Sequence, residues 1–279
     1  MTLIDSHSHT AFSHDGRAKA ELMIEAAVKK GLAYYAVTEH LDRDYKYCKK
    51  GRFLRQLNLK KYLRAVEKFR ERDFGDTFVA FGVEAGYCLE ATEWYKEKLS
   101  GYDFDVVINS IHTMHGQDAY FGKLFRGRKK DDVYTEYLDL LLESLHVPYA
   151  FDVIGHIGYI TRYSGYPDFT LCEDRYAERI DALLKEIIAL DKCVEINTHI
   201  RHPVMKYLPE KGILRRYFEL GGRRITFSSD AHTPGDIGKD FDLAASVALE
   251  TGFTDWTVYK KHSPETVAIT FDKNQEKGV

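Results

Sequence analysis

Cysteine and proline are scarce in this chain of 279 residues, which has four cysteines and six prolines. The cysteines form no CxxC pair and are widely separated, at Cys48, Cys88, Cys172 and Cys193. This spacing excludes a disulfide framework and a zinc ribbon. The chain also lacks internal repeats and any linker rich in Pro, Gly or Ser. We therefore predict a single domain that spans residues 1–279.

Long apolar runs are absent. The N-terminus also lacks the basic region followed by an apolar stretch that is typical of a secretory signal. No excess of positive charge is present either, because the formal net charge is −3 and the Lys and Arg residues are dispersed. A dedicated nucleic-acid surface is therefore disfavoured, and the run RGRKK at residues 126–130 is interpreted as a solvated loop. We expect a cytoplasmic protein whose partners include neither a membrane nor a nucleic acid.

Apolar and aromatic residues are plentiful, at 44% and 13% of the chain, so a large core can form without covalent links. Short apolar or β-branched runs alternate with helical patterns. This alternation predicts parallel strands joined by crossover helices, and seven units favour an α/β fold that is a closed or nearly closed barrel. A doubly wound open sheet is the alternative. The seven expected strand and helix pairs are 3–7 with 18–31, 34–40 with 59–71, 77–85 with 92–99, 105–112 with 133–145, 151–157 with 174–190, 193–198 with 212–220, and 224–232 with 241–250.

Histidines and carboxylates gather at the carboxyl ends of these expected strands. In a barrel these ends form one rim, which is where active sites lie. One histidine at such a position is weak evidence, because single histidines often serve in packing, but six strand ends carry candidates here. The candidate metal ligands are His7, His9, His14, His40, Glu84, His112, His156, Asp230 and His232.

The spacing of these candidates indicates a metal site. Residues i and i+2 of a strand point to the same face, so His7 and His9 can bind one ion together, and Asp230 and His232 repeat this spacing. One four-coordinate zinc needs at most four ligands, so nine candidates predict two or three ions. Glu84 is the natural bridging carboxylate. Closely spaced ions are typical of phosphoester hydrolysis, where they stabilise the attacking and leaving oxygens.

The segments DSHSHTAFSHDG, TEHLD, GVEAG, SIHTMH, GHIGYI and SSDAH resemble the motifs of the polymerase-and-histidinol-phosphatase (PHP) family, from residue 5 to residue 232. The resemblance implies a single distorted (β/α)7 barrel and three divalent transition-metal ions, either Zn, Mn or Fe. It also implies catalytic roles for Glu84, Asp230 and His232. The implied ligand sets are His7, His9, Glu84 and Asp230 for one ion, Glu84, His112 and His156 for a second, and His14, His40 and His232 for a third.

Within this family, the chain length and the segments GHIGYITRY and EINTHIRHP are similar to those of the stand-alone histidinol-phosphatases of histidine biosynthesis. These enzymes hydrolyse L-histidinol phosphate to L-histidinol and phosphate, which is the reaction we expect here. One departure is Ile157, which follows His156 where many family members have proline. No expected ligand changes, but the shape of the loop can differ.

Two arginines are expected in loops above the same rim, Arg162 after His156 and Arg201 after Glu195. A guanidinium fork suits a phosphate dianion, so both are predicted to bind the substrate phosphate, as the resemblance also implies. Additional flanking residues are candidates for protonating the leaving group, for contacting the substrate ring, or for orienting a ligand histidine. They are His115, His199, His202, Tyr163 and Asp5.

Three other functions are compatible with these residues. A phosphoesterase of the same family could act on another small phosphate ester or on a nucleotide. A non-catalytic metal-binding module is disfavoured, because every expected ligand position carries a competent residue. A metal-dependent amidohydrolase shares the opening His–x–His, but the SSDAH segment and the extra histidines favour phosphoester chemistry. Assays with phosphate and amide panels would separate these alternatives.

Overall fold

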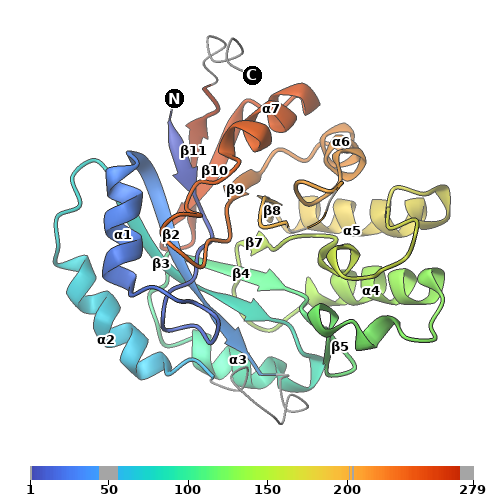
Figure 1. Cartoon of the computed structure of the whole chain (residues 1–279), viewed down its shortest axis with the longest axis horizontal. Coiled ribbons are helices and arrows are strands. Elements are labelled where there is room, and N and C mark those ends of the chain that lie inside the picture. The colour runs from blue at the N-terminus through green and yellow to red at the C-terminus, as the bar shows by residue number, and fades with distance from the viewer. Residues whose placement is uncertain (1, 44–55, 201, 203, 271–279) are drawn as a thin grey trace.

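The computed structural model of the chain describes residues 2–43, 56–200, 202 and 204–270. Seven parallel strands form one sheet in the order β1-β2-β3-β4-β7-β8-β9, with helices arranged around them (Figure 1). The barrel strands are β1 (Leu3–Asp5), β2 (Leu32–Asp42), β3 (Phe78–Gly86), β4 (Val106–Ser110), β7 (Val153–Ile154), β8 (Cys193–Asn197) and β9 (Ile225–Ser228).

The sheet closes almost completely between its first and last strands. The Ser6 N–H donates to the Phe227 carbonyl at 2.9 Å, and the His9 N–H donates to the Ala231 carbonyl at 2.8 Å. Ser8 and Ala231 form a parallel bridge just beyond the ends of β1 and β9. The prediction of a nearly closed (β/α)7 barrel is therefore confirmed, and the open doubly wound sheet is excluded.

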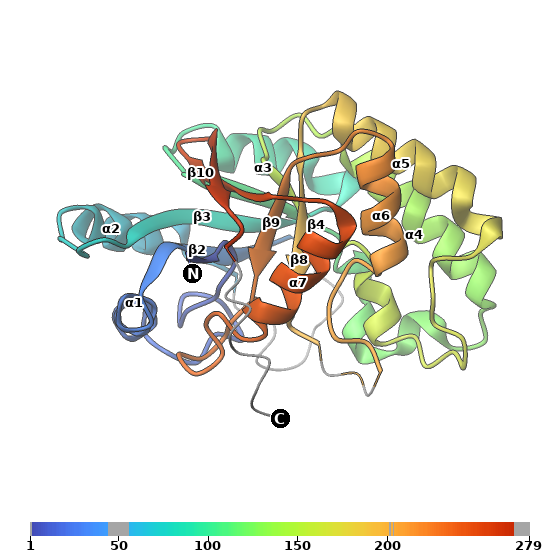
Figure 2. The same ribbon diagram turned by 90° about the horizontal axis from the view of Figure 1, so that it is seen from above.

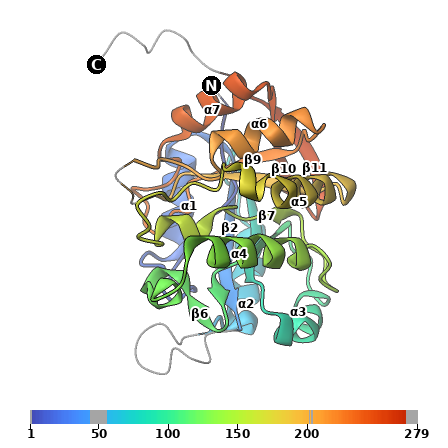
Figure 3. The same ribbon diagram turned by 90° about the vertical axis from the view of Figure 1, so that its right-hand side faces the viewer.

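Each barrel strand is followed by a helix, at the positions that the sequence predicts. Helices α1 and α2 lie on one side of the strands, and α4, α5 and α6 lie on the opposite side (Figure 2). Figure 3 shows α4 and α5 running side by side across that outer surface. The helices are α1 (Ala20–Lys29), α2 (Leu59–Arg70), α3 (Thr92–Leu99), α4 (Lys130–Ser144), α5 (Ala177–Ala189), α6 (Lys211–Glu219) and α7 (Phe241–Thr251).

Helix α2 illustrates how the local sequence sets an element. The Asn58 side chain accepts a hydrogen bond from the Lys61 N–H at 3.1 Å, which caps the first turn. Tyr62, Val66 and Phe69, spaced three and four residues apart, form the buried face of the helix. The Tyr62 hydroxyl also donates to the Gly82 carbonyl at 2.9 Å, so the helix is fastened directly to β3.

A hairpin of β10 (Asp255–Lys260) and β11 (Ser263–Ala268) was not predicted from the sequence. Its Trp256 is fully buried, with ring-centroid distances of 6.3 Å to Phe227 and 5.9 Å to Phe241. The His262 N–H, in the hairpin turn, donates to the carbonyl of Asp105, which directly precedes β4. The hairpin therefore covers the amino ends of the strands and leaves the carboxyl ends as the accessible rim. β11 is mostly exposed and polar, so it gives little strand signal in the sequence.

Smaller elements complete the described part of the chain. They are the short hairpin β5 (Thr113–Met114) and β6 (Gln117–Asp118), and the 3-10 turns η3 (Leu89–Ala91), η4 (Ala119–Phe121), η5 (Lys123–Phe125), η6 (Tyr159–Arg162) and η7 (Asp174–Tyr176). Cys88, Cys172 and Cys193 are free thiols. Among the described residues, no helix combines the length and the apolar character needed to cross a bilayer.

Candidate metal centre

The carboxyl ends of the barrel strands bring the predicted ligands together, as the sequence indicated. Residues of β2 and β3 pair in register, so that His40 lies directly opposite Glu84. The loop after β9 carries Asp230 with a φ of 47°, a left-handed backbone conformation that is uncommon for a residue with a side chain. Such strained residues often occur at functional sites. His7, His9, Glu84, His112 and His156 are all at most 5% exposed.

Glu84 lies at the centre of the cluster. Its Oε1 is 3.0 Å from His112 Nε2 and 2.8 Å from His156 Nε2. Its Oε2 is 2.9 Å from His40 Nδ1 and 3.3 Å from His7 Nε2. Burial alone would raise the pKa of Glu84, but the surrounding histidines, with His112 and His7 foremost, lower it well below its usual range. The carboxylate is therefore ionised and sits between two groups of histidines.

The first group of ligand atoms consists of His7, His9 and Asp230, with Glu84 beside them. The Nε2 atoms of His7 and His9 are 3.0 Å apart, and His9 Nε2 is 3.1 Å from Asp230 Oδ1. His9 Nε2 is also 3.5 Å from Glu84 Oε2. The ligand atoms of one zinc ion, each about 2.0–2.2 Å from the metal, are separated by distances of this size. This group matches the set that the family resemblance implies for one ion.

The second group consists of Glu84, His112 and His156, and the structure adds His40 to it. His112 Nε2 and His156 Nε2 are 3.4 Å apart, on the two sides of Glu84 Oε1. His40, Glu84 and His112 also place one ligand atom each within 4.8 Å of one another. His40, which the sequence assigned to the third ion alone, thus lies between two groups.

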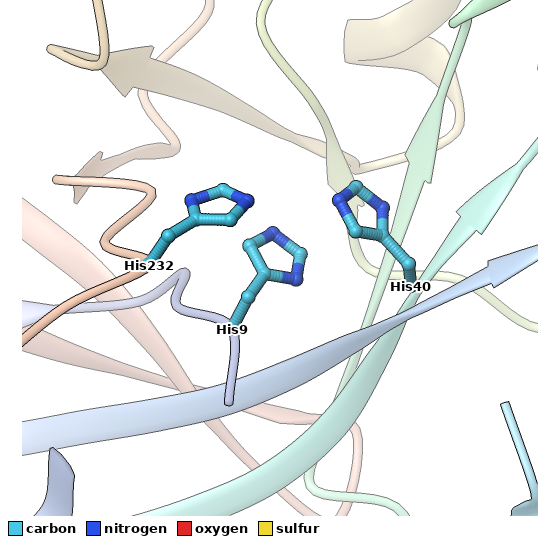
Figure 4. A group of neighbouring side chains, drawn as sticks. All are labelled: His9, His40 and His232. Carbon is cyan, nitrogen blue, oxygen red and sulfur yellow. The ribbon is translucent and has the colours of Figure 1, made fainter. Parts of the chain in front are cut away.

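The third group surrounds His40 and His232, with the ring of His9 between them (Figure 4). The ring of His9 stacks on that of His40 at 4.0 Å and lies 4.5 Å from that of His232. Asp15 Oδ2 is 3.0 Å from His232 Nε2 and 3.5 Å from His40 Nε2. His14 Nε2 lies near this carboxylate, 3.9 Å from Asp15 Oδ2.

Asp15 was missed in the sequence analysis. It stands beside His14 in the segment SHDG, where an acidic residue next to a candidate ligand was the available signal. Its contacts with two histidines identify it as a further candidate ligand of the third group. The sequence alone selected His14, because nothing in it shows which of two adjacent side chains faces His232.

Two further carboxylates that the sequence analysis did not select hold the ligand rings in place. Glu195 Oε1 is 2.7 Å from His7 Nδ1, and Asp42 Oδ1 is 3.0 Å from His112 Nδ1. A carboxylate on the second ring nitrogen fixes the tautomer and the orientation of a ligand histidine. The available signal was an acidic residue within a buried strand, because Glu195 lies in the middle of β8 and Asp42 is the last residue of β2.

Asp5 was expected to orient a ligand histidine in this way, and the structure shows its carboxylate bonded to the backbone of His7 rather than to a ring nitrogen. Its carboxylate accepts hydrogen bonds from the N–H groups of Ser229 and Gly238, each at 2.9 Å. Burial raises the pKa of Asp5 to about 6, against these hydrogen bonds. Asp5 therefore anchors the loop that carries Asp230. Asp5 is the last residue of β1, two residues before His7 in the chain.

The cluster has the properties of a site for metal ions. Among the described residues, Glu84 Oε2, His40 Nδ1, His156 Nδ1 and Asp15 Oδ1 are buried without a hydrogen-bond partner in suitable geometry. Each such atom costs about 1–3 kcal/mol in a folded protein, so a concentration of them requires compensation. Imidazole nitrogens and carboxylate oxygens suit Zn, Mn and Fe. Several groups in this centre can thus hold divalent metal ions.

Arg162, predicted to bind phosphate, lies beside this cluster at the end of η6. Its side chain is 4% exposed, and its Nη1 is 4.0 Å from Asp230 Oδ2. The Arg162 Nη2 donates to Asn197 Oδ1 at 2.6 Å, whereas Nε is buried with no hydrogen-bond partner among the described residues. The Nε–H of Arg162 is therefore a donor that could bind an anion. The second predicted phosphate ligand, Arg201, lies outside the described residues.

The flanking histidines differ in their distance from the cluster. His199 Nδ1 is 2.8 Å from the carbonyl oxygen of Asp230, and its ring is 5.2 Å from that of His232. His202 instead packs against Phe169 at a centroid distance of 4.6 Å. The side chain of His115 is 67% exposed and pairs with Glu136. Of these three candidates, only His199 contacts a predicted metal ligand.

Comparison with known proteins agrees with this geometry. The model of the PHP domain family matches residues 5–199 of the chain. The chain belongs to the PHP domain family. A protein of Clostridium acetobutylicum named "probable histidinol-phosphatase" is 35% identical over 248 residues, which cover 88% of this chain and 92% of that protein. The histidinol-phosphatase of Lactococcus lactis is 25% identical over 278 residues, which cover 99% of this chain and 98% of that protein.

A solved structure shares the PHP-type barrel. The crystal structure of histidinol phosphate phosphatase from Lactococcus lactis, complexed with Zn, L-histidinol and phosphate, superposes with a TM-score of 0.80. The alignment covers 95% of this chain and 99% of that one, at 22% sequence identity. At this level of identity the likeness establishes the fold, and it supports the barrel topology described above.

An experiment can distinguish Asp15 from His14 as the candidate ligand of the third group. We expect Asp15→Asn to lower the metal content by about one ion per chain, because it removes the carboxylate charge that lies 3.0 Å from His232 Nε2. His14→Asn should have a smaller effect, since His14 lies further from the other ligand atoms. Elemental analysis of both purified variants measures this. Equal losses would show that His14 contributes as much as Asp15, and loss only in His14→Asn would restore the assignment from the sequence.

Proposed function

We propose that this chain is a metal-dependent histidinol-phosphatase, which hydrolyses L-histidinol phosphate to L-histidinol and phosphate in histidine biosynthesis. The observation that carries this proposal is the position of the Arg162 guanidinium, with an unpartnered Nε, beside a cluster of nine predicted metal ligands. The names of the relatives from Clostridium and Lactococcus support the choice of substrate. The cytoplasmic location remains a prediction.

The proposed cofactors are three divalent transition-metal ions. When bound, such ions supply Lewis acidity toward phosphate oxygens and a nucleophile at neutral pH. Glu84 would contribute to two of the three groups, because each of its oxygens faces different histidines. Asp230 and His232 would act with Glu84 as the residues nearest to the reacting phosphate. The presence of Zn in the related Lactococcus structure supports transition metals in general.

Arg162 would bind the phosphate oxygens through the donors that Asn197 does not occupy, while one hydrogen of its Nη2 stays with Asn197. An arginine provides planar, paired donors that match a phosphate group. Arg201 keeps its predicted role as the second phosphate ligand, from a position outside the described residues. Asp230 and Arg162 together would place the phosphate at the edge of the metal cluster.

The substrate ring would contact a series of aromatic side chains, Tyr159, Tyr163 and Tyr120, that extends from the cluster to the surface. The ring of Tyr159 lies 5.0 Å from that of His156, and Tyr163 follows at 5.3 Å from Tyr159. Tyr120, which is 56% exposed, lies 5.4 Å from Tyr163. Aromatic faces attract flat rings and exclude water from them. This arrangement suits a small ring attached to a phosphate ester.

The proposal is tested by activity on a substrate panel. The purified protein, loaded in turn with Zn, Mn or Fe, is assayed with L-histidinol phosphate, nucleoside monophosphates, other small phosphate esters and an amide panel. We expect the highest kcat/KM for L-histidinol phosphate and no activity in excess chelator. A preference for nucleotides would favour the alternative phosphoesterase, preference for an amide would favour an amidohydrolase, and metal binding without turnover would indicate a non-catalytic module.

The activity should depend on pH through competition between protons and metal ions. In the metal-free centre, burial alone would lower the pKa of His112, but Glu84 and Asp42 raise it to about 10. The pKa of His40 is raised as well, by Asp15 and Glu84 acting against burial. A histidine with a raised pKa keeps its proton to a higher pH, so metal binding must displace that proton. Apparent metal affinity should therefore increase as the pH is raised.

We expect kcat/KM to fall as the pH is lowered through the range in which these histidines take up protons, and added metal to restore part of the lost activity. The measurement is a pH profile of kcat/KM at two concentrations of the same metal. The acid limb should move to lower pH at the higher concentration. An acid limb that does not move with metal concentration would show that ligand protonation does not limit the activity.

A further inference from the structure

Asn197, the last residue of β8, lies between the proposed phosphate ligand and a proposed metal ligand. Its main chain is fixed on both sides, by hydrogen bonds of 2.8 Å in both directions with Leu208 and by its register opposite Ser228 in β9. The residue is completely buried. Its side chain therefore has one fixed place, between the loops that carry Arg162 and Asp230.

The Asn197 amide makes every hydrogen bond that it can form. Its Oδ1 accepts from Arg162 Nη2 at 2.6 Å and from the His199 N–H at 3.0 Å. Its Nδ2 donates to Asp230 Oδ2 at 3.3 Å and to Ser228 Oγ at 3.4 Å. A primary amide has two acceptor sites and two donor hydrogens, so its capacity is filled. The orientation is unambiguous, because a guanidinium only donates and an ionised carboxylate only accepts.

This arrangement holds two opposite charges near each other but outside direct hydrogen-bond contact. Arg162 Nη1 and Asp230 Oδ2 are 4.0 Å apart, and the guanidinium could close on the carboxylate to form a bidentate pair. Such a pair would occupy the Arg162 donors needed for phosphate and the Asp230 oxygen needed for metal. The Asn197 amide accepts a hydrogen bond from the Arg162 guanidinium and donates one to the Asp230 carboxylate. Each charged group thus has a hydrogen-bond partner without binding directly to the other.

We propose that Asn197 is a positioning residue that keeps Arg162 available for phosphate and Asp230 available for metal. The inference rests on the proposed function, because it assigns Asn197 a role between two groups of that site. Asn197 acts through Arg162 and Asp230, because its amide has no donor or acceptor left for a substrate or a metal. No other uncharged side chain of this size presents both an acceptor and a donor in the required directions.

The test is binding of inorganic phosphate to the metal-loaded protein, measured by calorimetry, which needs no turnover. Asn197→Ala should weaken phosphate binding about tenfold or more. Without Asn197 the Arg162 guanidinium would be misplaced, and a misplaced binding group loses affinity of this order. Asn109→Ala is the matched control. Asn109 is also a buried asparagine in a barrel strand, β4. Its Nδ2 donates to the Ser144 carbonyl and its Oδ1 accepts from the Tyr149 hydroxyl, and its replacement should leave phosphate binding unchanged.

A double-mutant cycle separates positioning from a general loss of structure. In an Arg162→Ala background, Asn197→Ala should weaken phosphate binding by less than about threefold, since its effect passes through Arg162. Metal content and the thermal midpoint are measured for every variant. If Asn197→Ala fails to fold, Asn197→Ser, which leaves a smaller cavity and cannot reach Arg162, takes its place in the cycle.

Two results would overturn the inference. The first is near-normal phosphate binding by Asn197→Ala at full metal content. The second is an equal loss in the presence and absence of Arg162, which would indicate a purely structural role. Failure of the proposed function would look different. In that case the unaltered protein would not hydrolyse L-histidinol phosphate, while the phosphate-binding cycle would still report on Asn197.

Discussion

Glu84→Gln should release metal from the protein and lower kcat/KM for L-histidinol phosphate by about two to three orders of magnitude or more. The change keeps the shape of the side chain but removes the charge that faces His112 and His156 on one oxygen and His40 and His7 on the other. Removing one partner from a buried charge pair costs about 3–5 kcal/mol. This range corresponds to about 150- to 5,000-fold in an equilibrium or rate constant.

The measurement is metal content by elemental analysis, followed by kcat/KM at saturating metal. More than one ion per chain is expected in the unaltered protein and at least one ion fewer in Glu84→Gln. Glu67→Gln, which removes a carboxylate from the exposed surface of α2, is the control and should change neither quantity. A Glu84→Gln variant with full metal content would contradict the central position of this carboxylate. At most one metal ion in the fully active protein would contradict the three-ion proposal.

Arg162→Ala is expected to lower kcat/KM by about 10- to 150-fold while the metal content stays unchanged. A hydrogen bond to a charged group is worth about 1.5–3 kcal/mol, and this range gives the expected factor. Arg162→Lys should restore only part of the activity, because an ammonium supplies the charge without the planar pair of donors. Arg215→Ala, at an exposed position on α6, serves as the control.

The same assay extends to Arg201 and to the aromatic series of Tyr159, Tyr163 and Tyr120. Arg201→Ala should show a similar loss if both arginines bind phosphate. Both arginine variants should lose activity equally on all phosphate esters, whereas Tyr163→Ala should change the ranking of substrates. Normal turnover across the phosphate panel by either arginine variant, with metal retained, would remove that arginine from the proposed site.

The gathering of the candidate metal ligands was predictable because the relevant signals are local. His7 and His9 share a strand face through their spacing, and the apolar runs that precede Glu84, His112 and His156 mark the ends of strands. In a parallel barrel all such ends lie on one rim, so the topology brings the ligands together once the strands are recognised. The seven strand and helix units follow from the same alternation. The β10–β11 hairpin escaped prediction because its outer strand is exposed and polar.

The sequence by itself determined the barrel, the rim and the residue types that gather there, since these depend on patterns within a few residues. The tertiary structure alone decided which groups meet: that Asp15 contacts His232, that His40 reaches Glu84, and that Asn197 hydrogen-bonds to both Arg162 and Asp230. These pairs are separated by 33 to 217 residues in the chain. Their distances depend on strand register, barrel closure and loop conformation, and the identity of two residues does not encode the distance between their side chains.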